Sequence, residues 1–349
     1  FMKKIIVINI KIFILFIILT EVLFGSWFSK YNFGIHMKGI INDKVFIKTE
    51  GIGYKEKFLF SRNSLGFRNN EFDASKIDGI FMGGSTAVEK SLKYEDTIVG
   101  ILNNKFKNKK IIIANAGQQG KSVYGYLCDF KYWFPKIKNL KPKYYIFYTG
   151  INEVNKFKNS EFLNCTLSTS KMGTLEKIYD YILISSLYLS NIRKIRLKYG
   201  LGTGLIVFKY QLDNEVLYKS YQEVDEIYHG TENFNNTLTI KQIKVLDNYK
   251  SNLEKLKVIF DERKIKPIFI TQIRREGISN SLYLINRQTK IFAQKNDYIL
   301  IKLDEELVLN SRDFIDGPHT NQKGSKKVAD FIYNKVKKYF LDIEDNKIN

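Results

Sequence analysis

Short apolar runs alternate with longer helix-like stretches along much of this chain. Three of the runs, "GIFM" at 79–82, "IIIA" at 111–114 and "YYIFYT" at 144–149, are typical of buried strands. Helix-like stretches lie between them, near 94–106 and 122–140. This alternation of strands and helices predicts a parallel sheet that is covered by helices on both faces.

The same pattern returns in the last third of the chain. Apolar residues recur every three or four positions from Ile243 to Phe260, which predicts a long helix. "PIFITQ" from Pro267 and "YILIKL" at 298–303 predict two more strands. A last helix carries apolar residues on one face up to Phe340.

Two regions do not fit this pattern. Residues 29–75 are mixed and aromatic, and the Asn, Ser and Gly residues of "SRNSLGFRNNEF" suggest turns. Residues 155–240 mix helical patches with Gly-rich and polar pieces. The expected organisation is an anchor at 1–28, a linker or extension at 29–75, a core in two parts at 76–154 and 241–341, a mostly helical insertion or cap at 155–240, and a polar tail at 342–349.

The N-terminus is strongly apolar. Lys3 and Lys4 precede "IIVINIKIFILFIILTEVLFGSWF" at 5–28, which only Lys11 and Glu21 interrupt with charge. Its length suits one membrane crossing, which takes about 20 residues. A cleaved signal peptide is the alternative, but no clean small-x-small site follows the apolar run. We expect a single-pass anchor in the cell membrane that projects from the folded part, with the remainder of the chain outside the cytoplasm.

Composition changes this picture little. The 349 residues include 56 Lys and Arg against 36 Asp and Glu, a net charge of +20. The basic residues are scattered, so a nucleic-acid partner is not expected, although anionic lipid or an acidic polymer fits a basic surface. Cys128 and Cys165 show no metal-ligand spacing; one disulfide bridge between them is possible.

Candidate chemistry follows the predicted strands, whose carboxyl ends are where open α/β sheets bind ligands. In "FMGGSTAVEK", Ser85 stands at a strand-to-helix turn, and Gly83 and Gly84 let the backbone bend. A Ser at this position exposes its hydroxyl and its own N–H. The simpler interpretation is a helix N-cap, which is a common role for Ser.

Two further strand ends carry candidate hydrogen-bond donors. Gly120 in "NAGQQGKS" could offer an unobstructed backbone N–H, and Asn152 in "YTGINEV" could donate from its amide to a developing oxyanion. A turn glycine and a capping Asn are the simpler interpretations.

The fourth candidate is "DGPHTNQKG", which holds one of only three His residues in the chain. Ser85 would attack an acyl carbonyl, His319 would take its proton, and Asp316 would orient the imidazole. Ser85 N–H, Gly120 N–H and the Asn152 amide would form the oxyanion hole. We therefore expect Ser85 Oγ within hydrogen-bond reach of His319, with Asp316 on the other ring nitrogen. The remaining His residues are His36, near the anchor, and His229, in the insertion.

These four blocks, in this order, resemble the SGNH hydrolases, also called GDSL esterases or lipases. The blocks are "GGST", "NAGQQGKS", "GINE" and "DGPH", and the resemblance covers about residues 77–153 and 241–340. It implies a flavodoxin-like three-layer α/β/α sandwich that needs no metal and no organic cofactor. The family pattern has Asp where this chain has Gly84 and Glu153, which leaves the triad intact and puts the substrate subgroup and loop geometry in doubt.

The resemblance favours an extracytoplasmic serine esterase that cleaves an acyl ester, with acetyl as one candidate acyl group. The anchor, "NSLGFR" and "GGST" together look like membrane-anchored members associated with surface polysaccharides, so a surface glycan or lipid is the expected substrate. The same triad could instead serve an O-acyltransferase that uses a sugar hydroxyl in place of water. Alternatives from other classes are a non-catalytic binding module of a surface assembly and a polyanion binder.

Overall fold

Five parallel strands form the central sheet of the structure, which is a computed structural model. They are β3 (Ile77–Gly83), β4 (Ile112–Asn115), β5 (Tyr144–Tyr148), β7 (Lys266–Ile270) and β8 (Ile299–Ile301). Their order across the sheet is β4-β3-β5-β7-β8, and every neighbouring pair is parallel. Counted along the chain, this is the 2-1-3-4-5 order of flavodoxin-like folds. The predicted strands and the predicted fold class are confirmed.

The structure describes residues 2–25, 27, 44–51, 54, 56–156, 178, 182, 185–189, 191–192, 205–209, 218–229 and 238–348. The predicted insertion at 155–240 therefore lies largely outside the described residues, as does all of 28–43.

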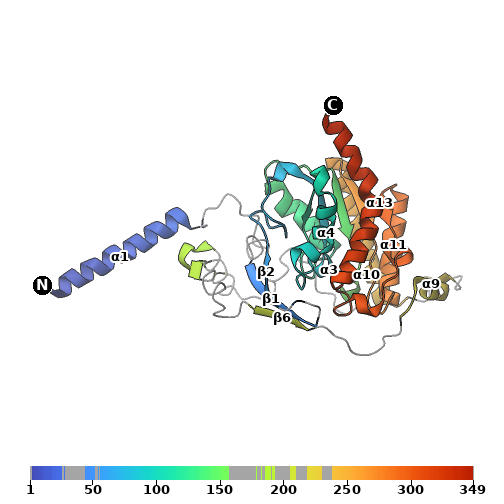
Figure 1. The fold of residues 1–349 in the computed structure, drawn as a ribbon, viewed down its shortest axis with the longest axis horizontal. Coiled ribbons are helices and arrows are strands. Elements are labelled where there is room, and N and C mark those ends of the chain that lie inside the picture. The colour runs from blue at the N-terminus through green and yellow to red at the C-terminus, as the bar shows by residue number, and fades with distance from the viewer. Residues whose placement is uncertain are drawn as a thin grey trace.

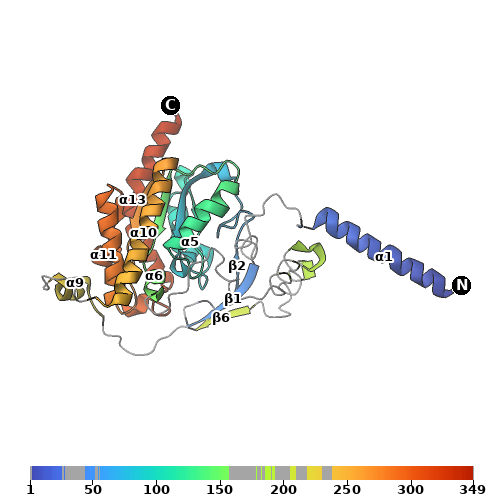
Figure 2. The ribbon, with the colours of Figure 1, turned by 180° about the vertical axis from the view of Figure 1, so that it is seen from behind.

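Helices cover both faces of the sheet. One layer contains α4 (Ile98–Lys105) and α13 (Gln322–Ile348), and the other contains α5 (Val123–Cys128), α10 (Ile240–Arg263) and α11 (Asn280–Lys295) (Figures 1 and 2). The remaining α-helices are α3 (Ser85–Val88), α6 (Ile151–Lys156), α9 (Tyr221–His229) and α12 (Leu303–Glu306). Shorter 3₁₀ or π turns are Ala74–Lys76, Tyr94–Asp96, Lys107–Lys109, Asp129–Trp133, Phe134–Lys136 and Ser311–Asp313.

The core lies between the sheet and these layers. Every residue of β3 and β5 is buried, which explains why these strands read as continuous apolar runs rather than alternating ones. Phe147 of β5 stacks on Phe269 of β7 with ring centroids 5.1 Å apart, and Phe260 of α10 packs on Phe147 at 5.3 Å. Aromatic contacts of this kind pack the layer of α5, α10 and α11 against the sheet.

Helix α11 was not predicted, although its signals are present in the sequence. Ser279 caps it by accepting a hydrogen bond from Leu282 N–H at 3.3 Å. Its buried side chains include Leu282, Ile285 and Phe292, which follow a helical period. The helix fills the crossover between β7 and β8.

A second, three-stranded sheet is built from regions that the sequence pattern did not resolve. β1 (Lys44–Glu50) pairs with β2 (Phe58–Ser61) in antiparallel fashion and with β6 (Leu205–Lys209) in parallel. Its apolar side chains, including Phe58 and Phe60, form a cluster with Val88 of α3. The N-terminal extension and the insertion thus meet in one sheet that packs near Ser85.

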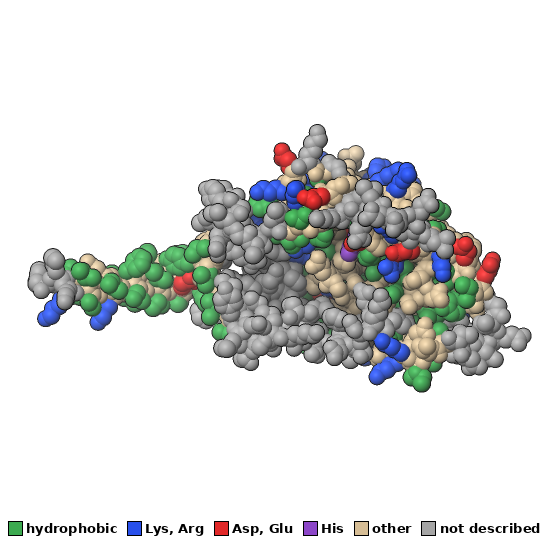
Figure 3. All heavy atoms as spheres, turned by 90° about the horizontal axis from the view of Figure 1, so that it is seen from below, with side chains coloured by type: hydrophobic (Ala, Val, Ile, Leu, Met, Phe, Trp, Pro, Cys, Tyr) green, Lys and Arg blue, Asp and Glu red, His purple; other side chains and the backbone are tan. Residues whose placement is uncertain are grey.

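Helix α1 (Met2–Phe24) projects from the α/β domain (Figure 1). Among the described residues, the Lys4–Phe24 part is the one helix long and apolar enough to cross a membrane, with a mean hydropathy of 2.6 and none of it buried. Hydrophobic side chains cover it, with basic ones toward its free end (Figure 3). The predicted N-terminal helix is confirmed; length and apolarity alone fit an anchor or a signal sequence.

Candidate active site

The first predicted block forms a sharp strand-to-helix turn. β3 ends at Gly83, Gly84 precedes the helix, and Ser85 is the first residue of α3. A first-turn N–H has no acceptor within its own helix. Within the described residues, neither Ser85 N–H nor Ser85 Oγ makes a hydrogen bond, so both remain available to a substrate.

The Asn152 side chain lies directly against this turn. Its Nδ2 donates to Lys121 O at 2.9 Å, and it stands only 1.7 Å from the place where a Cβ on Gly84 would be. Only glycine leaves room for the amide there. This gives a physical reason for Gly84 at the position where the family pattern has Asp.

The second block approaches the same point from β4. Gln118 N–H donates to Gly83 O at 3.1 Å, which ties the loop to the end of β3. Gly120 has a φ of +70°, and a Cβ built on it would meet no atom within 4 Å. Glycine is therefore favoured by the backbone conformation, and the space beside it is open. In the described part of the chain, no hydrogen bond uses Gly120 N–H.

A buried ion pair holds this loop from behind. Lys121 Nζ lies 2.6 Å from Asp129 Oδ2, and each side chain is 1% exposed. Burial lowers the pKa of Lys121 and raises the pKa of Asp129, against their mutual attraction. Because removing either partner would leave a buried charge unpaired, this pair fixes the backbone next to Gly120.

The last block places Asp316 on His319 as predicted. His319 Nδ1 lies 2.8 Å from both carboxylate oxygens of Asp316, and His319 N–H donates to Asp316 Oδ1 at 2.9 Å. Burial alone would raise the pKa of Asp316, but the hydrogen bonds and charge of His319, with Arg274 nearby, bring it below its ordinary value. The carboxylate thus stays ionised and can stabilise an imidazolium. The His319 side chain is 28% exposed, and a His side chain is visible at the surface of the face seen in Figure 3.

Glu89 joins the serine helix to the histidine loop. It follows α3, and its fully buried carboxylate accepts hydrogen bonds from Ile98 N–H at 2.6 Å, from Thr320 Oγ1 at 3.3 Å and from Ser325 Oγ. Thr320 is the neighbour of His319, so one buried carboxylate connects the end of the helix that begins at Ser85 with the residue that follows His319. Burial raises the pKa of Glu89 to about 7, although these hydrogen bonds and Arg68 oppose the shift.

Two arginines of the upstream "SRNSLGFR" stretch also hold these loops. The Arg68 guanidinium is buried and donates to Glu89 O at 2.6 Å and to the carbonyls of Val88 and Leu92. Arg62 donates to Gly117 O at 2.6 Å. Sequence reasoning read this stretch as turns and missed both roles, which depend on partners far away in the chain.

The predicted hydrogen bond between Ser85 Oγ and His319 is absent from the described contacts. The contacts of Glu89 nevertheless bring the two segments to the same edge of the sheet. Catalytic pairs of this kind are often loose without substrate and tighten when it binds. The structure thus gathers Ser85, Gly120, Asn152, Asp316 and His319 at one edge without closing the Ser–His bond.

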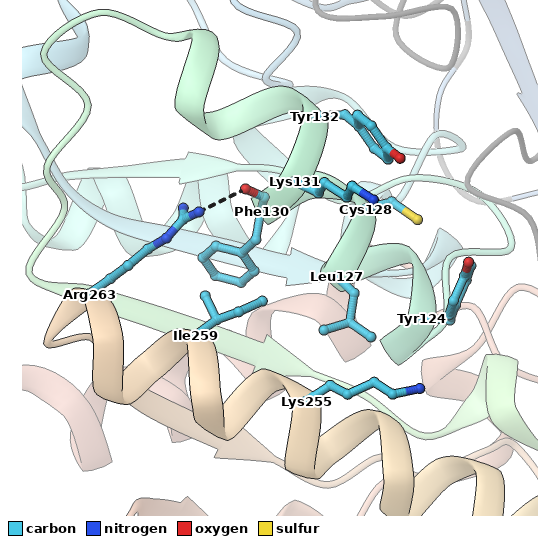
Figure 4. Close-up of a pocket in the computed structure, with 9 residues that line it drawn as sticks. All are labelled: Tyr124, Leu127, Cys128, Phe130, Lys131, Tyr132, Lys255, Ile259 and Arg263. Carbon is cyan, nitrogen blue, oxygen red and sulfur yellow. Dashed lines mark hydrogen bonds between the residues drawn. The ribbon is translucent and has the colours of Figure 1, made fainter.

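A surface groove lies away from the predicted site residues. A groove of about 440 Å³ runs between α5 and α10, and its lining includes Tyr124, Phe130, Lys131, Lys255, Ile259 and Arg263 (Figure 4). None of the predicted site residues lines it. Cys128, which also lines it, is disulfide-bonded, and Cys165 lies outside the described residues. In the described chain, no group of three His, Cys, Asp or Glu side chains is placed to hold a metal ion.

The strand order and the site at the carboxyl ends of the strands define a doubly wound α/β protein with a candidate site where such folds bind ligands. No protein-family model matches the chain, and no curated protein matches it. It resembles the solved structure of an acetylxylan esterase from Geobacillus stearothermophilus at 13% identity, covering 74% of this chain and 93% of that chain, with a TM-score of 0.43.

A protein described as lipolytic, of the G-D-S-L family, from Desulfitobacterium hafniense shares 9% identity, covering 74% of this chain and 99% of that chain, with a TM-score of 0.41. An α/β hydrolase enzyme from the metagenome of Lake Arreo, Spain, shares 12% identity, covering 74% and 93%, with a TM-score of 0.39. At these levels the reaction must be argued from the residues of this chain.

Gly84→Ala should displace the Asn152 amide, because the new Cβ would lie 1.7 Å from Nδ2. If that amide is an oxyanion donor, kcat for a soluble ester falls by about 10²–10³. The double variant Gly84→Ala/Asn152→Ala should be no slower than Asn152→Ala alone, since both changes remove the same group. If the two losses in kcat multiply in the double variant, Gly84 acts in some other way.

Glu89→Gln should change how stability depends on pH. The folded-state pKa of about 7 lies above the ordinary 4.5, so the folded state holds this proton more tightly than the unfolded state. Its contribution is fully present below about pH 4.5 and is lost as pH rises through about 7, by at most about 1.4 kcal/mol per pH unit. The free energy of unfolding of wild type minus that of Glu89→Gln, measured by urea titration, should therefore fall across this window. A difference that stays constant with pH would contradict a raised pKa.

Proposed function

We propose that this chain is a membrane-anchored serine esterase of the SGNH type, acting outside the cytoplasm on an acyl ester of a surface glycan or lipid. The observation that carries the proposal is the Asp316–His319 pair, with both carboxylate oxygens 2.8 Å from Nδ1, on the sheet edge where Ser85 starts a helix. The Asn152 amide lies against Gly84, the residue before that serine, and the space beside Gly120 is open.

The reaction follows from these positions. Ser85 Oγ attacks the acyl carbonyl while His319 Nε2 takes its proton, and Asp316 stabilises the resulting imidazolium. The carbonyl oxygen becomes an oxyanion that accepts from Ser85 N–H, Gly120 N–H and the free N–H of the Asn152 amide. His319 then gives its proton to the leaving alcohol oxygen. This leaves the acyl group on Ser85.

The second half repeats the first with a new nucleophile. Water loses a proton to His319 and attacks the acyl carbonyl, the acid departs, and Ser85 recovers its proton. If a sugar hydroxyl takes the place of water, the same residues transfer the acyl group. Product analysis with and without a glycan acceptor separates esterase from O-acyltransferase.

Two observations support the proposed location. Helix α1 has the length and apolarity of a membrane span, and Lys3 and Lys4 precede its apolar run. Cys128 is disulfide-bonded, and disulfides persist mainly in oxidising compartments. Both fit a chain whose catalytic part lies outside the cytoplasm.

A fluorophosphonate probe should label Ser85 in the full chain, because the probe reacts with a serine activated by an adjacent base. Labelling, mapped by peptide mass spectrometry, should vanish in Ser85→Ala and fall by about 10³-fold or more in His319→Ala. His229→Ala is the matched control and should label normally. Label on another serine, or loss of labelling in His229→Ala with His319→Ala intact, would show that the nucleophile or base is misassigned.

Asn152→Ala should lower kcat by about 10²–10³ with KM little changed, because an oxyanion donor acts in the transition state. Asn152→Asp should be at least as slow, since a carboxylate repels the developing charge. If the hydrogen bond to Lys121 O makes Asn152 only a structural group, the Ala variant should lose about 1 kcal/mol of stability and keep its turnover. Steady-state kinetics and a melting curve on the same preparation distinguish the two roles.

A further inference from the structure

The single acidic residue of the apolar helix has partners outside that helix. Glu21, one turn from the end of α1, accepts hydrogen bonds from Leu187 N–H at 2.8 Å and Tyr188 N–H at 3.1 Å, and also from Ser186 Oγ. Thr20 Oγ1 lies 2.7 Å from Tyr188 OH. A charge that interrupted the apolar run in sequence thus connects α1 to a segment far along the chain.

We call the described residues 178, 182, 185–189, 191 and 192 the anchor-side segment. Its described residues other than Ser186 are helical. Its aliphatic side chains are open to solvent: Ile178 and Ile192 are each 50% exposed, Ile182 38% and Leu189 36%. Exposed apolar side chains that gather in one place mark a contact surface for a partner or a membrane.

The contacts with Glu21 set the level of this segment relative to a bilayer. The helical part Lys4–Phe24 has 21 residues, and about 20 residues cross the hydrocarbon core. If α1 spans the membrane, its Thr20–Glu21 end lies at the outer boundary of the hydrocarbon. The residues hydrogen-bonded to that end must then lie at the same boundary.

The polar groups at this end fit such a boundary. Trp27 Nε1 donates to Glu21 Oε2 at 3.1 Å, and Tyr188 OH contacts Thr20. Trp and Tyr are enriched at membrane–water boundaries, where the ring is apolar and the N–H or O–H is hydrated. In the sequence, "RKIRLK" at 193–198 follows the segment with four cations, which suit anionic headgroups.

We infer that the anchor-side segment lies on the outer surface of the membrane, with its exposed aliphatic side chains in the lipid. The chain then has a second membrane contact besides α1. This inference rests on the proposed anchoring by α1 and is independent of the proposed esterase reaction. The partner is a bilayer surface that contains anionic lipid.

The test uses the full chain in vesicles of phosphatidylcholine and phosphatidylglycerol that also contain a phospholipid with a diazirine in its acyl chain. After illumination, mass spectrometry maps the peptides that carry lipid. The expected result is lipid on peptides of α1 and of the anchor-side segment. Peptides of α10 and α11 should carry none, although Val258 is 55% and Ile291 40% exposed there.

A triple variant shows whether the aliphatic side chains make the contact. Ile182→Asn, Leu189→Asn and Ile192→Asn together should lower labelling of the segment at least about tenfold, because each aliphatic side chain contributes about that factor to partitioning into lipid. Labelling of α1 should not change. The matched control carries Val258→Asn, Ile291→Asn and Val308→Asn, all exposed on the α/β domain, and should label as wild type.

Three results would overturn the inference. Labelled α1 with an unlabelled segment would mean that the segment does not touch lipid, and equal labelling in the triple variant would mean that its aliphatic side chains make no contact. Unlabelled α1 would remove the anchoring as well. Hydrolysis of a soluble ester, assayed in parallel, reports on the esterase proposal separately.

Discussion

A buried guanidinium and a buried carboxyl group hold the segment that follows Ser85. Arg68 donates to three carbonyls at the end of α3, and Glu89 receives hydrogen bonds from the loop that carries His319. Removing one such buried group is strongly destabilising, because the polar groups that it leaves without a partner remain buried away from water. Arg68 and Glu89 therefore set the separation between Ser85 and His319, although neither contacts the Ser85 hydroxyl or the His319 imidazole among the described hydrogen bonds. The buried Lys121–Asp129 pair likewise holds the backbone next to Gly120.

Much of the fold could be read from the sequence because the parallel strands are short, continuously apolar and separated by periodic helices. The residues after each strand could be found for the same reason, since the topology brings the carboxyl ends of parallel strands to one edge. The roles of Arg62 and Arg68 could not be found, because a cation in a turn-like stretch is normally solvated and its carbonyl partners lie elsewhere in the chain. The strands β1, β2 and β6 were missed because their pairing is long-range and their local pattern is weak.

In the proposed reaction, the distinction between hydrolysis and acyl transfer depends on which nucleophile, water or a sugar hydroxyl, reaches the acyl-enzyme, and the proposed catalytic groups are common to both. An anchor and a membrane-lying segment would restrict the orientations in which the site meets its substrate. A soluble enzyme samples all orientations, whereas a tethered one meets ester groups at a defined height above the lipid. The effective concentration of a surface-bound substrate then depends on geometry more than on pocket affinity.

The pairing of β1 with β6 has a consequence for the way the protein is made. Phe46 lies opposite Leu205, so the small sheet cannot close until more than half of the predicted insertion has been synthesised. During that interval Phe58 and Phe60, with part of their apolar cover missing, would be exposed on the nascent chain. Long-range pairings of this kind form late and slow the search for the native state. Translation through residue 209 is thus the earliest point at which all three strands of the small sheet are present, while β7 and β8 of the main sheet follow later in the chain.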